Sequence, residues 1–545
     1  MILAKMSENR QKPWGYILGC IGLFCFSAGL RFWGLNRFNT LVFDEVYFAN
    51  NGYNYLHQIP FFDIHPPLGK LLIALGMSLA KWLPFDQTIV TQTDIWTLPT
   101  WHYRWLNATI GSCIPLLGVA IVQTLTHQGR YALLAGFLIS LDGLLLVESR
   151  YCLLNIYLVF FGLLGHYFFF QAILSSPSKR SFGVRSLRLT LAGMMLGACI
   201  SIKWNGLGFL LAIYGLWSIA LLLRWWAWWQ QQPAEVSISL FPRYLRKITS
   251  FIDHHPARYS SECSSENQSN DRLDILRRIT LLRPHHLFLY FGLIPALFYR
   301  LQWIPHLQLN PQFDFWEVHR QIWGYNIRMQ SGASVHPYCS TWNTWPWLIR
   351  PVGYFFEEVK TSADAIYFGL SKTVLPRIYD VHAFGNPFLW WASAGAIVFL
   401  LLFTLNIWRE RFTRYRSVKS KSFYSENSPS TSQLTSQSKV SVQSNVELGI
   451  VIYWLVSYGA NWLPWSQVSR CLYLYHHMPA SIFSFCALGW LLHRGLQQSD
   501  RFWNLCSWIT IVLIFFSFIY WLPIYLGLPL PPEAFHQRMW LRSWY

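Results

Sequence analysis

Two acidic residues, Asp44 and Glu45, stand side by side in an otherwise apolar stretch that runs from Leu41 to Val46. A carboxylate is costly to bury without a partner or a task, so the pair is a candidate general base or metal ligand. The alternative is a solvated loop in which the two carboxylates begin a helix and accept hydrogen bonds from its unpaired backbone amides. The residues alone leave both interpretations open.

A second polar motif follows in the segment Asp63-Ile64-His65-Pro66-Pro67-Leu68-Gly69-Lys70. The two prolines fix the backbone and exclude a helix through them. Asp63, His65 and Lys70 could orient or bind a charged ligand. The alternative is a rigid turn that leads into an interfacial helix, because the run after Lys70 is apolar.

Five cations lie at the predicted outer ends of apolar segments. Each could extend its charge into the lipid headgroups, which is the common position of Lys and Arg at a membrane interface. Five of them on one face, beside an acidic loop, could instead form a ring that binds a lipid phosphate. The five are Arg31, Arg104, Arg150, Lys203 and Arg470.

The composition shows what kind of protein must position these residues. Of 545 residues, 53% are hydrophobic and 12% are charged, whereas soluble domains carry about 25% charged residues. This excludes a disordered chain and a disulfide-stapled secreted domain, and it predicts an all-α polytopic membrane protein. About 11 apolar segments are candidate transmembrane helices. They are 13–30, 105–124, 131–147, 152–173, 188–202, 205–223, 286–302, 387–407, 447–463, 473–492 and 503–522.

The positive charges predict the topology. Lys5, Arg10 and Lys12 precede the first segment, which we expect to be a retained span with its N-terminus in the cytoplasm. An odd number of spans then places the C-terminus outside. The loops assigned to the cytoplasm carry most of the Lys and Arg residues, so the net charge of +18 reflects topology and does not indicate nucleic-acid binding.

This topology predicts two long external loops, 33–104 and 303–386, where we expect the chemistry because long ordered loops are often functional. A Ser-rich cytoplasmic linker at 408–446 separates a transmembrane module at 1–407 from a second one at 447–545. The 10 cysteines include no CxxC pair and no metal-ligand spacing. We therefore expect small buried cysteines without a redox role, and no metal site.

The same motifs resemble the protein O-mannosyltransferase family, which is glycosyltransferase family 39. FDEVYFANNGYNYL followed by FFDIHPPLGKLLIALG is similar to the family's first external loop, and Arg31 lies thirteen residues before Asp44, as the family's first-span arginine does. The resemblance continues in the same order along nearly the whole chain. Further matching segments are YRWLNATIGSCIPLLG, LDGLLLVESRYCLLN, ISIKWNGL, VHPYCSTWNTWPWLIRPVGYFF, FGNPFLWW, YGANWLPWSQVSRCLYLYHHMPA and QRMWLRSWY.

The resemblance implies a GT-C membrane fold and the transfer of mannose, with inversion, from a dolichyl- or polyprenyl-phosphate mannose donor to Ser or Thr hydroxyls of proteins. Asp44 would be the general base, and Glu45 would hold substrate or position Asp44. No cofactor is implied. The site would face the outside of the plasma membrane. The residues expected to bind the donor phosphate or sugar are Arg31, His65, Lys70, Arg104, Lys203, Arg470 and His476.

The chain departs from the family pattern at three places. Asn155 stands where the family often has Asp, and Asn326 stands where it often has His, so no role is transferred to either residue. The second external loop has no room for the β-trefoil repeats of eukaryotic members, which is typical of a bacterial-type member. Two alternatives stay open: a GT-C enzyme that glycosylates a lipid or polysaccharide, and a transporter, against which the absence of a two-fold repeat of interrupted helices argues.

Overall fold

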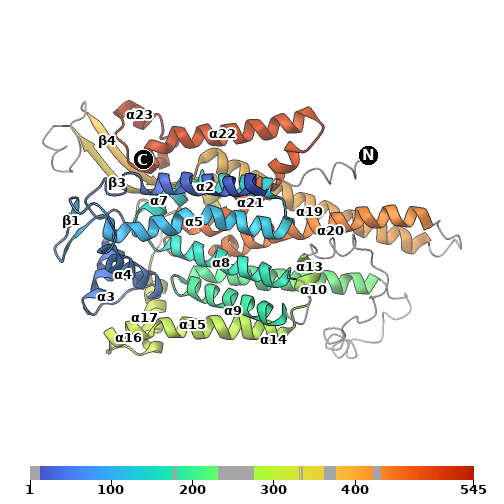
Figure 1. Ribbon diagram of the computed structural model, residues 1–545, viewed down its shortest axis with the longest axis horizontal. Helices are drawn as coiled ribbons and strands as arrows, with labels where there is room; N and C mark the ends of the chain where they lie inside the picture. The colour runs from blue at the N-terminus through green and yellow to red at the C-terminus, as the bar shows by residue number, and fades with distance from the viewer. Residues whose placement is uncertain are drawn as a thin grey trace.

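The computed structural model describes residues 13–175, 181–230, 275–330, 335–360, 376–421 and 431–545, together with Gly332. The chain forms an elongated bundle whose long helices run roughly parallel to the longest axis (Figure 1). Buried apolar side chains from nearly every helix join in one continuous core.

The first half of the chain supplies seven bundle helices. One of them begins at a side-chain cap: Asp142 accepts a hydrogen bond from the Leu145 amide at 2.9 Å at the start of α7. Helices α6 and α7 are bent by 63° relative to each other at this point. The seven are α2 (Pro13–Phe32), α5 (Trp101–Thr126), α6 (Gly129–Ser140), α7 (Gly143–Arg150), α8 (Asn155–Ile173), α9 (Ser181–Ile200) and α10 (Leu207–Gln230).

The second half packs against the first without a boundary between their cores. The Tyr131 hydroxyl donates to the Cys486 carbonyl at 2.8 Å, and His166 Nδ1 lies 3.0 Å from the Tyr453 hydroxyl. The helices are α13 (Ile275–Ile279), α14 (Pro284–His286), the π-helical η3 (Leu287–Leu293), α15 (Ile294–Gln302), α19 (Pro387–Lys421), α20 (Thr431–Trp462), α21 (Met478–Leu496) and α22 (Arg501–Leu526).

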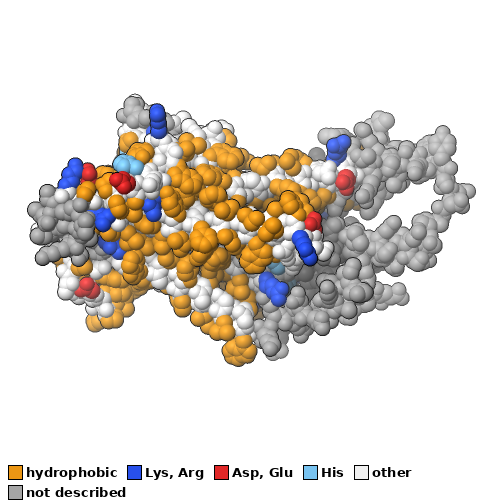
Figure 2. All heavy atoms as spheres, turned by 90° about the horizontal axis from the view of Figure 1, so that it is seen from above, with side chains coloured by type: hydrophobic (Ala, Val, Ile, Leu, Met, Phe, Trp, Pro, Cys, Tyr) orange, Lys and Arg blue, Asp and Glu red, His pale blue; other side chains and the backbone are white. Residues whose placement is uncertain are grey.

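Among the described residues, eight helices are long and apolar enough to cross a membrane, or nine if the bent α6–α7 pair is one span. The two other predicted spans, 447–463 and 473–492, coincide with α20 and with the end of the outer loops followed by α21. Figure 2 shows hydrophobic side chains across the middle of one face and charged side chains at its two ends, as a bilayer requires. The polytopic helical architecture is confirmed, while the count of about 11 spans stays a prediction.

The predicted linker at 408–446 is partly helical, because α19 and α20 both extend into it. Residues 422–430 of that range lie outside the described residues, as do 231–274 of a predicted cytoplasmic loop. The division into two modules and the cytoplasmic position of the linker stay predictions.

The two long loops predicted to be external lie together at one end of the bundle, beside the C-terminus and opposite the start of α2 (Figure 1). Two short antiparallel sheets in them were not predicted: Val90–Gln92 (β1) with Thr97–Pro99 (β2), and Val352–Val359 (β3) with Arg377–Ala383 (β4). The helices here are α3 (Glu45–Leu56), α4 (Leu68–Ala80), α16 (Ile304–Leu309), α17 (Phe315–Arg328) and α23 (Pro532–His536). The 3₁₀ turns are η1 (Trp204–Gly206), η4 (Trp342–Trp347), η5 (Leu463–Gln467), η6 (Leu474–His477) and η7 (Arg542–Trp544).

Candidate active site

A strained turn places Asp44 at the start of α3. Phe43 has a φ of 53°, a left-handed backbone conformation that a bulky residue rarely adopts. The Glu45 carboxylate reaches back and accepts a hydrogen bond from the Val42 amide at 2.8 Å. The Phe43 ring stacks on Tyr354 of β3, with centroids 4.2 Å apart. Strain that the surroundings hold in place is a common feature of functional sites, and here it fixes the position of Asp44.

Arg104 of α5 stabilises this turn by pairing with Glu45. Its Nε and Nη2 donate to the two carboxylate oxygens of Glu45 at 2.8 and 2.7 Å, and both side chains are fully buried. Its remaining N–H groups donate to the carbonyls of Leu35, Phe38 and Thr40. With all five donors used, Arg104 has none for a phosphate, so its predicted role is wrong. Of the two roles predicted for Glu45, the geometry supports positioning of Asp44 and not contact with substrate.

Two further arginines of the predicted set lie elsewhere. Arg150 donates to four carbonyls around the end of α2, among them those of Leu30 and Gly34. Arg31 is fully buried, and its Nη1 donates to the hydroxyl and carbonyl of Ser27, while its Nε and Nη2 have no hydrogen-bond partner among the described residues. Neither lines the cavity described below. Of the five cations for which a phosphate-binding ring was one of two interpretations, only Lys203 and Arg470 line this cavity.

The Asp44 carboxylate is half-buried, and no donor among the described residues makes a hydrogen bond to it. Burial raises its pKa to about 6, with the negative charge of Asp63 adding to the rise and the nearby Lys203 ammonium opposing it. A carboxylate with a free oxygen and a pKa near the working pH is suited to accept a proton.

Lys203 lies beside Asp44, between the end of α9 and η1. Its ammonium donates to Asn155 Oδ1 at 2.9 Å and lies over the rings of Phe48 and Tyr475, 5.8 and 5.4 Å from their centroids. Burial lowers its pKa, and the charges of Asp44 and Glu148 act in the opposite direction. The ammonium is thus held in place and keeps donors for a ligand.

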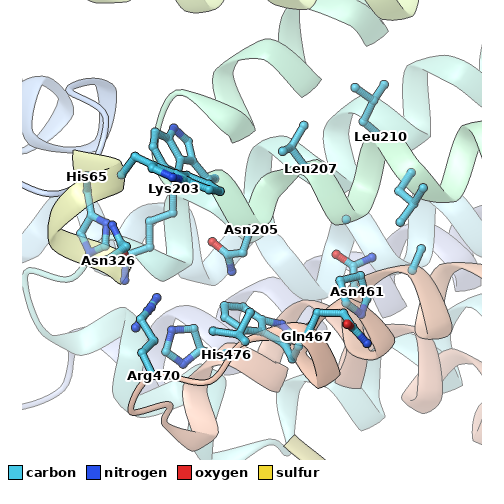
Figure 3. A pocket seen from close by; sticks show the side chains of 18 of the residues that line it. His65, Lys203, Asn205, Leu207, Leu210, Asn326, Asn461, Gln467, Arg470 and His476 are labelled. Carbon is cyan, nitrogen blue, oxygen red and sulfur yellow. The ribbon is translucent and has the colours of Figure 1, made fainter. Parts of the chain in front are cut away.

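A cavity of about 710 Å³ opens next to Lys203 (Figure 3). Its polar end is lined by His65 and Lys203 on one side and by Arg470 and His476 on the other. From there it continues along α10, where the lining side chains are mostly apolar. These are Leu207, Leu210, Leu211 and Tyr214, faced by Ala460, Asn461 and Pro464. A polar end with cations and an apolar extension suits an amphipathic anion.

His476 adds an imidazole to this polar end. Its Nδ1 lies 3.1 Å from the Tyr473 amide nitrogen and 3.0 Å from the Tyr473 carbonyl oxygen, and these contacts fix the orientation of the ring. Burial together with the charges of Arg470 and Lys203 holds the pKa of His476 well below its usual range. The ring is therefore neutral at pH 7.

Of the second polar motif, Asp63 and Lys70 stabilise the turn, and His65 lines the cavity. Asp63 accepts from the Asn51 amide at 2.8 Å and from the His65 backbone amide at 2.6 Å, and it pairs with Lys70 at 2.9 Å. Lys70 also donates to the His65 carbonyl. Lys70 is buried beneath the turn and does not line the cavity, so its predicted contact with the donor is wrong. His65 does line the cavity, and its binding to the donor stays a prediction.

A disulfide that the sequence analysis missed holds the segment next to Arg470. Cys471 is bonded to Cys339, 132 residues earlier in the chain. The Cys471 amide also donates to the Gln330 carbonyl at 3.0 Å. Arg470 is thus fixed between two outer loops. Both cysteines lie outside the long apolar segments, and this position is the sequence feature that could have predicted the disulfide.

Other cavity residues were missed because amides and tryptophans in a membrane protein carry no distinctive spacing. Asn326, to which no role was assigned, points into the polar end near His65 (Figure 3). Among the described residues, no group of three or more His, Cys, Asp or Glu could hold a metal ion. The missed residues are Trp204, Asn205, Trp323, Asn326, Asn461, Trp465 and Gln467.

Two models of one protein family match most of this chain. Residues 21–250 match the dolichyl-phosphate-mannose-protein mannosyltransferase family, and residues 312–544 match the C-terminal four-transmembrane region of protein-O-mannosyltransferase. A polyprenol-phosphate-mannose–protein mannosyltransferase of Mycolicibacterium smegmatis is 24% identical, covering 98% of this chain and 94% of that protein. Protein O-mannosyl-transferase 2 of Drosophila melanogaster is 31% identical over 38% of this chain and 28% of its own length.

The fold has a solved counterpart, the S. cerevisiae protein O-mannosyltransferase Pmt1–Pmt2 complex bound to the sugar donor. The TM-score is 0.66 at 16% identity, covering 99% of this chain and 94% of that one. Fold and site together define a multi-span membrane glycosyltransferase of the GT-C class. Within that class, the chain belongs to the protein O-mannosyltransferase family.

Proposed function

We propose that this protein transfers mannose from polyprenyl-phosphate mannose to Ser and Thr hydroxyls of acceptor proteins, with Asp44 as the general base. Family membership gives the reaction class, a mannosyl transfer from a lipid-linked donor to protein. The observation that carries the assignment of residues is an unpaired carboxylate that does not line the cavity itself but interacts electrostatically with Lys203, at the cationic end of a cavity that is apolar along α10.

The donor phosphate is bound between Lys203, Arg470 and the imidazole of His476. A hydroxyl is a weak nucleophile, so Asp44 removes its proton as the oxygen attacks the anomeric carbon. The lipid phosphate is an acidic leaving group that needs no proton donor, but its developing negative charge needs fixed cations. One base and no covalent intermediate give inversion at the sugar carbon.

The lipid tail accounts for the rest of the cavity. The polyprenyl chain lies along Leu207, Leu210 and Leu211, which stand on the apolar helix α10. The sugar then points toward Asp44, whose charge acts on both Lys203 and Tyr475. Burial raises the pKa of Tyr475 and the charge of Asp44 adds to it, in accordance with this proximity.

We place the site on the outer face of the plasma membrane, with the N-terminus in the cytoplasm. The Cys339–Cys471 disulfide supports this orientation, because disulfides persist on the oxidising side of a membrane. The site and the start of α2 lie at opposite ends of the bundle (Figure 1).

The test is transfer with the purified protein. Labelled polyprenyl-phosphate mannose is incubated with a Ser/Thr-rich peptide, and the matched control peptide has every Ser and Thr replaced by Ala. We expect label on the first peptide only, released by β-elimination. Label that appears on lipid or polysaccharide and never on the peptide would overturn the protein-acceptor assignment.

A further inference from the structure

One buried carboxylate near the site has no part in the mechanism above. Glu148 of α7 is fully buried. Both of its oxygens accept from the Asn155 side-chain amide at 3.2 Å, and Oε1 also accepts from the Tyr354 hydroxyl. Among the described residues, no Lys or Arg makes an ion pair with it. A buried carboxyl group is costly unless its contacts stabilise it, so its hydrogen-bond partners indicate which parts of the protein it acts on.

The first contact leads to the cation of the donor site. Asn155 donates to Glu148 through its nitrogen, and its Oδ1 accepts from the Lys203 ammonium at 2.9 Å. The amide therefore connects a carboxylate to an ammonium, and each charge polarises the amide in favour of the other. This chain fixes the orientation of the Asn155 amide and, through it, the position of Lys203.

The second contact leads to the turn that carries the base. Tyr354 donates to Glu148 and stacks on Phe43 with centroids 4.2 Å apart and an interplanar angle of 10°. Phe43 is the strained residue immediately before Asp44. Tyr475 contacts both parts of the site. The centroid of its ring lies 6.3 Å from that of Phe43 and 5.4 Å from the Lys203 ammonium.

We propose that Glu148 is a positioning residue that sets the base turn and the phosphate-binding lysine relative to each other, through Tyr354 on one side and Asn155 on the other. This rests on the proposed function and adds to it a residue that touches neither substrate. The Glu45–Arg104 pair stabilises the same turn, but neither of its residues makes a hydrogen bond to Lys203 among the described residues. Glu148 contacts both halves of the site.

The experiment exchanges the two ends of the Glu148–Asn155 pair. Glu148→Gln keeps the shape and removes the charge, and we expect kcat/KM to fall about 10- to 100-fold. Asn155→Asp alone sets two carboxylates against each other and is expected to lower activity similarly. The double variant Glu148→Gln/Asn155→Asp again has one amide and one carboxylate. Its new glutamine can accept from Tyr354 and donate to the new aspartate, which then pairs directly with Lys203. We expect recovery to within about fivefold of wild type.

The matched control is Glu358→Gln, the same change on an exposed residue of β3 that pairs with Lys360 at 3.0 Å. We expect no change there, since exposed ion pairs contribute little. Wild-type kinetics for Glu148→Gln would overturn the proposal. So would a double variant no more active than either single one, because a merely structural carboxylate would not be rescued by a charge on its partner.

A second readout does not depend on catalysis. Trp204, Trp323 and Trp465 line the cavity, so binding of polyprenyl phosphate is followed by tryptophan fluorescence. Glu148→Gln is expected to weaken this binding and the double variant to restore it. If wild type binds the lipid but transfers no mannose, the proposed function fails while the binding series still decides the role of Glu148. Equal binding by wild type and Glu148→Gln would overturn the coupling to Lys203.

Discussion

Two groups of cations at the outer end of the bundle differ in how their charges are satisfied. In the closed group, Arg104 is fully buried, and all five of its N–H groups bind Glu45 or backbone carbonyls. In the open group, Lys203 and Arg470 line a cavity and keep donors for a ligand. The three residues stand at similar positions in sequence, near the outer ends of apolar segments. What separates scaffold from site is whether the protein itself uses up the donors of the cation.

The largest expected effect concerns Asp44, the carboxylate that interacts with Lys203 of the open group. Asp44→Asn keeps the size of the side chain and removes its basicity, so kcat should fall on the order of 10²–10⁴-fold. The donor KM should change little, because a carboxylate does not attract a phosphate. Initial transfer rates at varied donor concentration measure both. Asp86→Asn, a change at a fully exposed carboxylate in the same loop, is the matched control. Equal loss of donor binding and turnover would argue that Asp44 is structural.

The pH profile gives an independent check on the same residue. Asp44 must be deprotonated to act as a base, and burial raises its pKa to about 6. In the wild type, kcat/KM should therefore be level above about pH 7 and fall about tenfold per pH unit below about 6. The residual activity of Asp44→Asn should lack this inflection. An inflection near the ordinary aspartate pKa of about 4 in the wild type would contradict the raised pKa.

For Arg104, in the closed group, we expect the effect of substitution on the stability of the fold. Arg104→Met removes the partner of a buried Glu45 and is expected to cost about 3–5 kcal/mol. Thermal unfolding in detergent measures the loss, with Arg320→Met, at an exposed pair on α17, as control. The sequence predicts instead a phosphate ligand, whose loss raises the donor KM, lowers kcat or does both. A raised donor KM at an unchanged Tm would return Arg104 to the site.

Asp44, Lys203 and Arg470 were predictable because a charge in an apolar sequence demands an explanation, and the resemblance placed them in order. The sequence could not separate them from Arg31, Lys70 and Arg104. That distinction depends on partners such as the Phe38 carbonyl, 66 residues from Arg104, or the Asp63 carboxylate beside Lys70.

The helical architecture was predictable for a similar reason, since long apolar segments in water-free surroundings must satisfy their own backbone groups. The break between α6 and α7 was not, because 131–147 has the composition of one continuous helix. The strands β3 and β4 pair across more than fifteen intervening residues, and the Cys339–Cys471 bond joins segments 132 residues apart. None of these contacts leaves a periodic trace in the sequence.

A smaller effect is expected in the open group. Arg470→Gln removes a charge-assisted hydrogen bond to the donor phosphate, which corresponds to about a 10- to 100-fold increase in donor KM. Tm should not fall, because Arg470 is half-buried and donates only to the Cys471 carbonyl and the Met329 sulfur among the described residues. Arg350→Gln, at another outer-loop arginine that donates to a backbone carbonyl, serves as control. A lower Tm with an unchanged KM would move Arg470 into the closed group.

The smallest expected effect is on the segment that carries Arg470. Removing the Cys339–Cys471 bond with the double variant Cys339→Ser/Cys471→Ser loosens this segment, but two backbone hydrogen bonds still hold it, Cys471 to Gln330 and Ser340 to Leu472. We therefore expect the donor KM to rise less than about tenfold at unchanged kcat, since Asp44 stands on a different loop. Reductant should reproduce the change in wild type and have no effect on the double variant, while Cys506→Ser, at a free cysteine of α22, should behave as wild type. If reduction lowers kcat and leaves KM alone, the bond acts on the base turn and not on Arg470, and the open group would then be held by its hydrogen bonds alone.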